Sequence, residues 1–248
     1  MSKAVVNMTL ADAGHYTPEQ AAARMAEFPK HERDARAKGI PMMGSGLIFP
    51  FAEEDITVRP FVIPPHWSQI NGLDFGYDHP FGATNLAWDR DADCIYVCKE
   101  YRQREASPVT HSAAIKPWGA WIPCAWPHDG LQHDKGSCEQ LAKQYRAQGL
   151  NMLPDRATFD DGTNSVEAGV LDMFERMETG RWKVFDTCQS WLEERRMYHR
   201  ADGKIVKQRD DLISSSRYAL MMKRSARVRP VKRDLEIPDY GIARGRHG

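Results

Sequence analysis

The apolar residues of this sequence change their spacing after Pro65, and this change constrains the fold more than any other feature. Three short runs rich in aliphatic and aromatic residues follow at 70–75, 83–88 and 94–101, and turn residues separate them. The last two runs are joined by Asp-Arg-Asp-Ala-Asp, which is typical of a hairpin connection. The pattern therefore predicts three consecutive antiparallel strands.

Helix and strand signals alternate in the rest of the chain. Helices are predicted at 108–116, 135–148, 166–177, 188–199 and 211–223, and short strands at 121–125, 151–153, 182–185 and 204–206. Strands that alternate with helices favour parallel pairing. The fold class we expect is therefore α/β, with a mixed sheet of three antiparallel strands then parallel strands, and helices on both faces.

The two ends of the chain differ from this pattern. Thr17 and Pro18 are typical of a helix start, and a first helix is expected to about Glu27, with a second at about 31–38. A stretch rich in Gly, Pro and Met follows. We therefore expect three parts: a leader outside the main sheet at 1–60, a folded domain at 61–225 and a basic tail at 226–248.

The net charge of zero conceals an asymmetry. Residues 195–248 hold 15 Lys and Arg against 6 Asp and Glu, so the rest of the chain is acidic. A basic region beside an acidic body is typical of a protein that binds a polyanion on one face. The alternative is a solvated basic tail with no partner.

Cysteine and hydropathy exclude other classes. The five Cys are odd in number and have no CxxC spacing, so we expect buried free thiols in a reducing compartment. No stretch approaches the roughly 18 apolar residues of a membrane helix, and no membrane partner is expected.

Three acidic positions each lie at the end of an apolar strand or the start of an apolar helix: Asp74, Asp129 and the pair Asp210-Asp211. Carboxylates brought together in this way form an oxygen-rich site that suits hard divalent cations, here Mg²⁺ or Mn²⁺. Two such ions clamp the attacking and leaving oxygens of a phosphodiester. The sequence therefore predicts a metal-dependent nuclease with two ions.

Each acid also has a simpler interpretation. Asp74 could be a turn residue, but alternation with Leu73 and Phe75 places it on the opposite face of a strand, where an uncompensated carboxylate is costly. Asp129 could serve the turn in His-Asp-Gly. Asp210 is expected at the helix N-cap and Asp211 as the ligand, with exchanged roles as the alternative.

Further residues could assist these acids. Asp78 could lend an extra oxygen or serve a turn, and three residues near the second acid could orient water or contact phosphate: His128, His133 and Lys135. Basic residues around the last helix are expected to hold a phosphate backbone without reading bases: Arg209, Arg217, Lys223, Arg224 and Arg227.

The segment Gly72-Leu-Asp-Phe-Gly-Tyr-Asp-His-Pro resembles the first acidic motif of the ribonuclease H-like nuclease domain in large terminase subunits of tailed phages. The order of strands, helices and acids over about 15–225 is similar to that family. The stretches Arg36–Pro41 and Gly44–Pro50 resemble the region that links the packaging ATPase to the nuclease. The resemblance implies a ribonuclease H-like fold for 61–225.

It also implies an endonuclease that cuts concatemeric double-stranded DNA, with Asp74 as first ligand, Asp129 as second and Asp210 or Asp211 as third. The implied partners are DNA, the terminase ATPase domain, the small terminase subunit and the portal or procapsid, in the cytoplasm of the infected bacterial host. The sequence has no G-x-x-x-x-G-K-[ST], so ATP hydrolysis by that route is not expected and the chain resembles a C-terminal fragment.

Two other functions fit the same residues. One is a non-catalytic module that binds DNA or docks to a capsid component, in which the acids are structural. The other is a different ribonuclease H-like nuclease, such as a junction resolvase.

Overall fold

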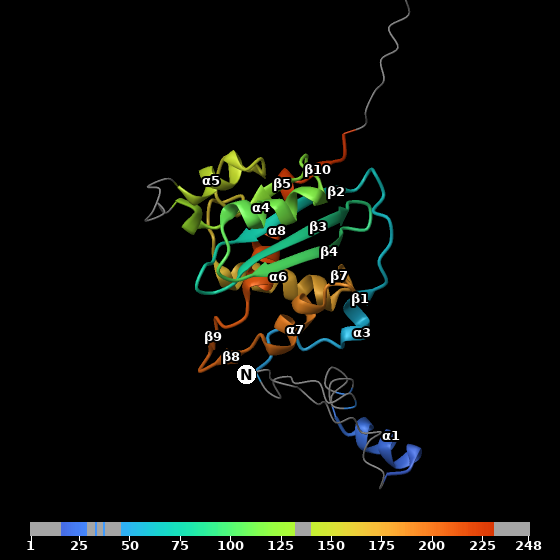
Figure 1. Ribbon diagram of the computed structural model, residues 1–248. Helices are drawn as coiled ribbons and strands as arrows, with labels where there is room; N and C mark the ends of the chain where they lie inside the picture. Colours follow the sequence, from blue (N-terminus) through green and yellow to red (C-terminus); the bar gives the residue numbers. More distant parts are fainter. Residues whose placement is uncertain (1–15, 29–32, 34–36, 38–45, 132–139, 231–248) are drawn as a thin grey trace, which may run out of the picture.

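The computed structural model describes residues 16–28, 33, 37, 46–131 and 140–230. Its main sheet has eight strands in the order β1-β7-β4-β3-β2-β5-β6, with β10 beside β2 (Figure 1). The bounds of its strands are β1 Thr57–Val58, β2 Ser68–Asp74, β3 Phe81–Asp89, β4 Cys94–Gln103, β5 Pro123–Ala125, β6 Asn151–Met152, β7 Trp182–Phe185 and β10 Arg227–Val228. A separate hairpin joins β8 Arg200–Ala201 to β9 Lys204–Ile205.

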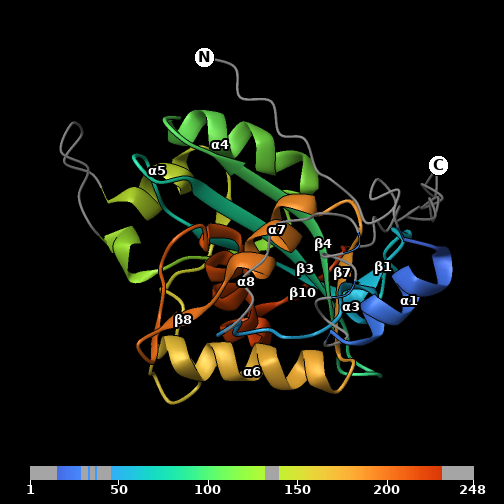
Figure 2. The same ribbon diagram turned by 90° about the horizontal axis from the view of Figure 1, so that it is seen from below.

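Helices cover both faces of the sheet (Figures 1 and 2). Those of the described residues are α1 Pro18–Ala26, α3 Glu53–Ile56, α4 Pro108–Ile115, α5 Leu141–Ala147, α6 Val166–Glu178, α7 Gln189–Met197 and α8 Asp211–Met221, with short 3-10 turns η2 Lys116–Trp118, η3 His128–Leu131 and η4 Lys223–Ser225. The helices α4 and α5 lie on one face, and α6, α7 and α8 on the other. The predicted α/β class is confirmed.

The pairing of the strands places the end of β2 beside the end of β5, at one edge of the sheet. The three strands β2, β3 and β4 are consecutive and antiparallel, as predicted, and β2 also pairs in parallel with β5. Carboxyl ends of parallel strands meet at the same edge of a sheet, so the segments after Asp74 and Ala125 leave the sheet side by side.

The core fills the space between sheet and helices. On the α4–α5 face, Phe81 stacks on His111 at 4.1 Å and on Tyr145 at 5.5 Å, measured between ring centroids. On the other face, Trp191 packs against Trp182 and donates its indole N–H to the Ser216 hydroxyl at 2.9 Å. The described cysteines are buried free thiols: Cys94, Cys98, Cys124 and Cys188.

The expectation that residues up to 60 lie outside the main sheet is wrong for Thr57–Val58. The strand β1 pairs in parallel with β7, and Phe49 and Ile56 are fully buried in the core. At the other end, β10 pairs antiparallel with β2, so Arg227 and Val228 belong to the sheet and not to a free tail. β1 and β10 have two residues each and are both followed directly by Arg-Pro, so no run of alternating apolar residues marks them in the sequence.

Helix positions otherwise follow the predictions closely. The first helix has the expected Thr17 cap, completed by Gln20 as a capping box. The described part of the helix predicted at 135–148 is α5, which begins at Leu141 after the extended Gln140. Residues 132–139 and most of the predicted helix at 31–38 lie outside the described residues. Within the described parts of the chain, every helix is too short or too polar to cross a membrane.

Candidate active site

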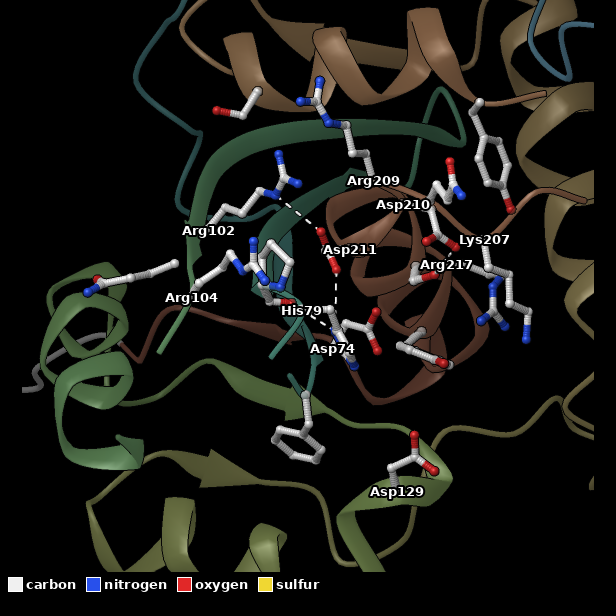
Figure 3. Close-up of a pocket in the computed structure, with 18 of the residues that line it drawn as sticks. Asp74, His79, Arg102, Arg104, Asp129, Lys207, Arg209, Asp210, Asp211 and Arg217 are labelled. Atoms are coloured by element: carbon white, nitrogen blue, oxygen red, sulfur yellow. Dashed lines mark hydrogen bonds and ion pairs between the residues drawn. The ribbon is translucent and has the colours of Figure 1, made fainter. Parts of the chain in front are cut away.

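A cleft of about 1050 Å³ opens at the edge where β2 ends, against the start of α8. All four predicted acids line it: Asp74, Asp129, Asp210 and Asp211. Figure 3 shows Asp74 between the Asp210-Asp211 pair and Asp129. Acids separated by more than 130 residues of sequence thus share one cavity.

Asp74 is the last residue of β2, so it lies at the end of an apolar strand. It is half-buried, and its neighbour Phe75 points to the opposite face, where it stacks on Tyr145 of α5 at 5.0 Å. Strand alternation therefore directs Asp74 to the face that α8 covers, as expected from the sequence.

Two glycines let α8 approach the strands closely enough to reach Asp74. A Cβ at Gly72 would lie 1.8 Å from the Ser215 carbonyl oxygen, and one at Gly82 would lie 2.6 Å from the Asp211 carbonyl oxygen. Any larger residue at either position would push the helix away. The start of α8 therefore lies directly over the end of β2.

The start of α8 is held by a residue of another helix. Glu194 of α7 accepts hydrogen bonds from the backbone N–H groups of Leu212 at 2.7 Å and Ile213 at 3.1 Å. Asp210 is the N-cap residue by position, yet in this described turn its side chain accepts no backbone hydrogen bond. The prediction that Asp210 caps the helix is therefore wrong: Glu194 satisfies those donors instead.

The two adjacent aspartates have different surroundings. Asp211 is buried; its Oδ2 lies 3.1 Å from Arg102 Nε, and its Oδ1 lies 3.6 Å from Nδ1 of the exposed His79. Asp210 is half-buried, and among the described residues its side chain accepts a long 3.4 Å hydrogen bond from the Ser214 hydroxyl.

Asp129 comes from the parallel neighbour of β2. It lies in the turn η3, four residues after β5 ends, and its side chain is exposed. The register of β5 on β2, with Gly72 opposite Ala125, brings this turn to the cleft.

Burial and the neighbouring carboxylates alter the titration of Asp74 and Asp210. Burial raises the pKa of Asp74 well above its usual range, and the charges of Asp210, Asp211 and Asp129 raise it further, whereas Arg217 opposes the shift. Burial and Asp211 also raise the pKa of Asp210. A divalent cation would relieve both the repulsion and the cost of burial.

The donor set fits a hard cation, because every acid offers carboxylate oxygens. The arrangement is nevertheless open: among the described residues, no group of three or more His, Cys, Asp or Glu side chains could hold an ion as it stands. Binding an ion therefore requires side chains to move, and the ion pair of Asp211 with Arg102 is one contact that must yield or be shared.

Comparison with known proteins identifies the family. Residues 71–223, more than half of the chain, match the model of the terminase RNaseH-like domain. The chain belongs to this family. It is 48% identical to the large terminase subunit of Salmonella phage P22 over 251 residues, covering 99% of this chain and 50% of that protein. It is 50% identical to that of Enterobacteria phage LP7 over 223 residues, covering 90% and 47%. The chain therefore spans about half the length of these relatives.

Solved structures agree with this terminase assignment. The nuclease domain of the P22 large terminase superposes with a TM-score of 0.70 at 48% identity, covering 74% of this chain and 95% of that one. The large terminase of a thermophilic bacteriophage, at 16% identity and a TM-score of 0.57 over 85% of this chain and 54% of that one, shares the fold. The predicted resemblance is confirmed, and the chain is a large-terminase nuclease domain by family.

The accessory residues predicted for this terminase domain are placed unevenly. Asp78 lines the cleft, and its carbonyl oxygen accepts a hydrogen bond from Arg104. His128 is exposed on η3 and is not in the described lining of the cleft. His133 and Lys135 lie outside the described residues.

The predicted phosphate contacts also separate. Arg209 and Arg217 line the cleft, but Arg217 is buried with its guanidinium 4.4 Å from the Tyr218 ring centroid. Among the described residues, those that line the cleft do not include Lys223, Arg224 or Arg227. These follow α8, whose 11 residues span roughly 16 Å, so they lie at the far end of the helix from the acids.

Two basic residues of the cleft were not predicted from the sequence: Arg102 and Arg104. Lys207, which also lines the cleft, lies within the basic region already noted at 195–248. Arg102 lies on β4 opposite Gly82, within the predicted hairpin. Pairing the predicted strands residue by residue could have placed it near the acids, but no local motif marks it.

Proposed function

We propose that this terminase domain is an endonuclease that cuts double-stranded DNA with the help of two divalent cations, Mg²⁺ or Mn²⁺. The observation that supports it most is the convergence of Asp74, Asp129, Asp210 and Asp211 in one cleft, where burial and then the repulsion of the other acids raise the pKa of Asp74. Carboxylates placed so that each destabilises the charge of another gain most from a bound cation. Such a cluster is costly unless it serves binding or catalysis.

Each acid has a role that follows from its position. Asp74 lies between the other acids and is suited to contact both ions, with Asp129 on one side and Asp210 or Asp211 on the other. The bound ions would supply an activated water and stabilise the leaving oxygen of the phosphodiester. The protein fixes the backbone of the acids through β2, η3 and α8, so that movement of side chains alone would bring their oxygens to the ions.

The basic rim would hold the DNA backbone. Arg104, Lys207 and Arg209 are exposed and line the same cleft as the acids. Contacts of this kind bind phosphates and carry no base information, so cutting should show weak sequence preference and a strong dependence on salt.

The wider assignment rests on the relatives. The substrate would be concatemeric viral DNA, and the partners the terminase ATPase domain, the small subunit and the portal or procapsid. The place of action would be the cytoplasm of the infected bacterium. These follow from the similarity to large terminases, of which this chain spans about half.

A second candidate is a domain that binds DNA without cutting it. The ion pair between Asp211 and Arg102, together with the open arrangement of the acids in the described residues, favours it. Nicking of supercoiled plasmid in Mn²⁺ distinguishes the two.

The test compares Asp74→Asn with Asp161→Asn, a matched change of an exposed acid outside the cleft. We expect the wild type and Asp161→Asn to nick plasmid in Mn²⁺, and Asp74→Asn to lose activity on the order of a thousandfold or more, as expected when a main electrostatic contact of the transition state is removed. Equal rates for all three proteins would refute Asp74 as a metal ligand. No nicking by the wild type would favour the binding module.

A further inference from the structure

Arg102 is shared between two acids that belong to different helices. Its Nε lies 3.1 Å from Asp211 Oδ2 on α8 and 3.3 Å from Glu194 Oε1 on α7. The Arg102 side chain is 22% exposed and reaches the cleft from β4, and Figure 3 shows it directed at Asp211. A single guanidinium group thus faces two carboxylates at once.

The two carboxylates are satisfied to different degrees. Glu194 uses Oε2 to accept the two N–H groups of α8, but its Oε1 is buried and accepts no hydrogen bond from any described residue. A buried carboxylate oxygen without a donor is unfavourable. Glu194 therefore has an unused acceptor that points to Arg102.

Asp211 has competing uses. If it is a ligand, as the proposed function requires of Asp210 or Asp211, the cation needs an oxygen that Arg102 now occupies. Its other oxygen faces His79, whose side chain is 66% exposed and can turn into solvent. A cation that binds Asp211 must therefore displace Arg102. Unlike His79, Arg102 is mostly buried and needs another partner inside the protein.

We propose that Arg102 is a positioning residue that exchanges carboxylates: it holds Asp211 in the metal-free domain and transfers to Glu194 Oε1 when a divalent cation binds Asp211. This inference rests on the proposed function. The exchange keeps Arg102 paired with a carboxyl group in both states, since Glu194 gains the donor that Asp211 gives up. It also explains why the acids are close together yet do not form a complete ion site.

Mn²⁺ affinity tests the exchange without reference to cutting. Free Mn²⁺ is measured by electron paramagnetic resonance during titration of wild type, Arg102→Gln, Glu194→Gln and the double variant. Removing the competitor should tighten binding by on the order of tenfold, the worth of one hydrogen bond to a charged group. Glu194→Gln keeps an oxygen for the helix N–H groups but removes the charge that would receive Arg102, and should weaken binding.

Removing any positive charge from the cleft would also change Mn²⁺ binding. Two controls therefore separate this general effect of charge from the specific contact of Arg102 with Asp211. Arg104→Gln removes the same charge from the same cleft, and Arg104 bonds the Asp78 carbonyl and not Asp211. It should tighten binding much less than Arg102→Gln. In the double variant the effect of Glu194→Gln should disappear, because no arginine remains to be received.

Melting temperatures measured in chelator show whether each variant is folded. If Glu194→Gln does not fold, the comparison of Arg102→Gln with Arg104→Gln still tests the exchange. Equal effects of Arg102→Gln and Arg104→Gln, with a wild type that binds Mn²⁺ and nicks DNA, would overturn the exchange and leave the nuclease proposal intact. Additive effects of Arg102→Gln and Glu194→Gln would also overturn it. A wild type that binds no Mn²⁺ would overturn both proposals.

Discussion

Replacing Glu194 with Ala should destabilise this domain more than any change to the adjacent aspartates of α8. Glu194 is 1% exposed and accepts the N–H groups of Leu212 and Ile213. Its removal leaves two buried donors without partners, each worth about 1–3 kcal/mol. Loss of the buried carboxylate offsets part of this cost, so we expect the unfolding free energy to fall by about 3 kcal/mol. This exceeds the roughly 0.5–2 kcal/mol for loss of an ordinary helix cap, because both donors are buried.

The aspartate at the N-cap position provides the contrast. In the described turn, Asp210 makes no side-chain cap hydrogen bond, and burial and the charge of Asp211 raise its pKa. Asp210→Ala should therefore change stability by less than about 0.5 kcal/mol, or raise it, because it removes repulsion and no backbone partner. Thermal unfolding in chelator at pH 7 should show a decrease of roughly 6–12 °C for Glu194→Ala, given about 2–4 °C per kcal/mol for a domain of this size.

The Glu194→Gln variant tests how the charge of Glu194 contributes to the stability of the domain. Burial raises the pKa of Glu194 to about 8, although Arg102 opposes this shift. A folded-state pKa above the unfolded value contributes stability that is complete below pH 4.5 and is lost as pH rises toward 8. The stability of Glu194→Gln relative to wild type should therefore increase over that range. A larger loss for Asp210→Ala than for Glu194→Ala would refute the assignment of the cap.

Three further predictions concern other parts of the domain. Burial lowers the pKa of His111 to about 4, so its contribution to stability is present above pH 6.5 and is lost as pH falls toward 4; His111→Phe should reduce that loss in melting curves. Gly72→Ala places a Cβ 1.8 Å from the Ser215 carbonyl oxygen and should cost about 1–3 kcal/mol or more in urea unfolding while abolishing nicking. Arg209→Glu, in the cleft, should flatten the salt dependence of DNA affinity, whereas Arg227→Glu, on β10, should leave the slope unchanged; the opposite ranking would place the DNA on another face.

Local pattern was enough to predict most of the secondary structure and the direction of Asp74. The alternation of Leu73, Asp74 and Phe75 places the carboxylate on one face whatever the rest of the chain does, because successive residues of a strand point to opposite sides. The helix with apolar residues at Val166 and Val170 follows from spacing in the same way. These signals act over a few residues, so a sequence displays them directly.

Tertiary structure decided which groups hold the acids in place. The start of α8 is held by Glu194, and α7 itself begins where Glu100 of β4 accepts the N–H groups of Ser190 and Trp191. This succession of contacts leads from the sheet through α7 to the acids. Each of these hydrogen bonds joins residues far apart in sequence, and the distance between donor and acceptor depends on how the helices pack on the sheet.

The same reason accounts for the errors. Asp210 has the residue type and position of a helix cap, but whether a cap is needed depends on the presence of another acceptor, and Glu194 approaches from a different helix. Arg102 reaches Asp211 because β4 pairs with β3 and Gly82 leaves room for α8. Hydrogen bonds and ion pairs of this range depend on separations of a few tenths of an ångström, which spacing along the chain does not encode.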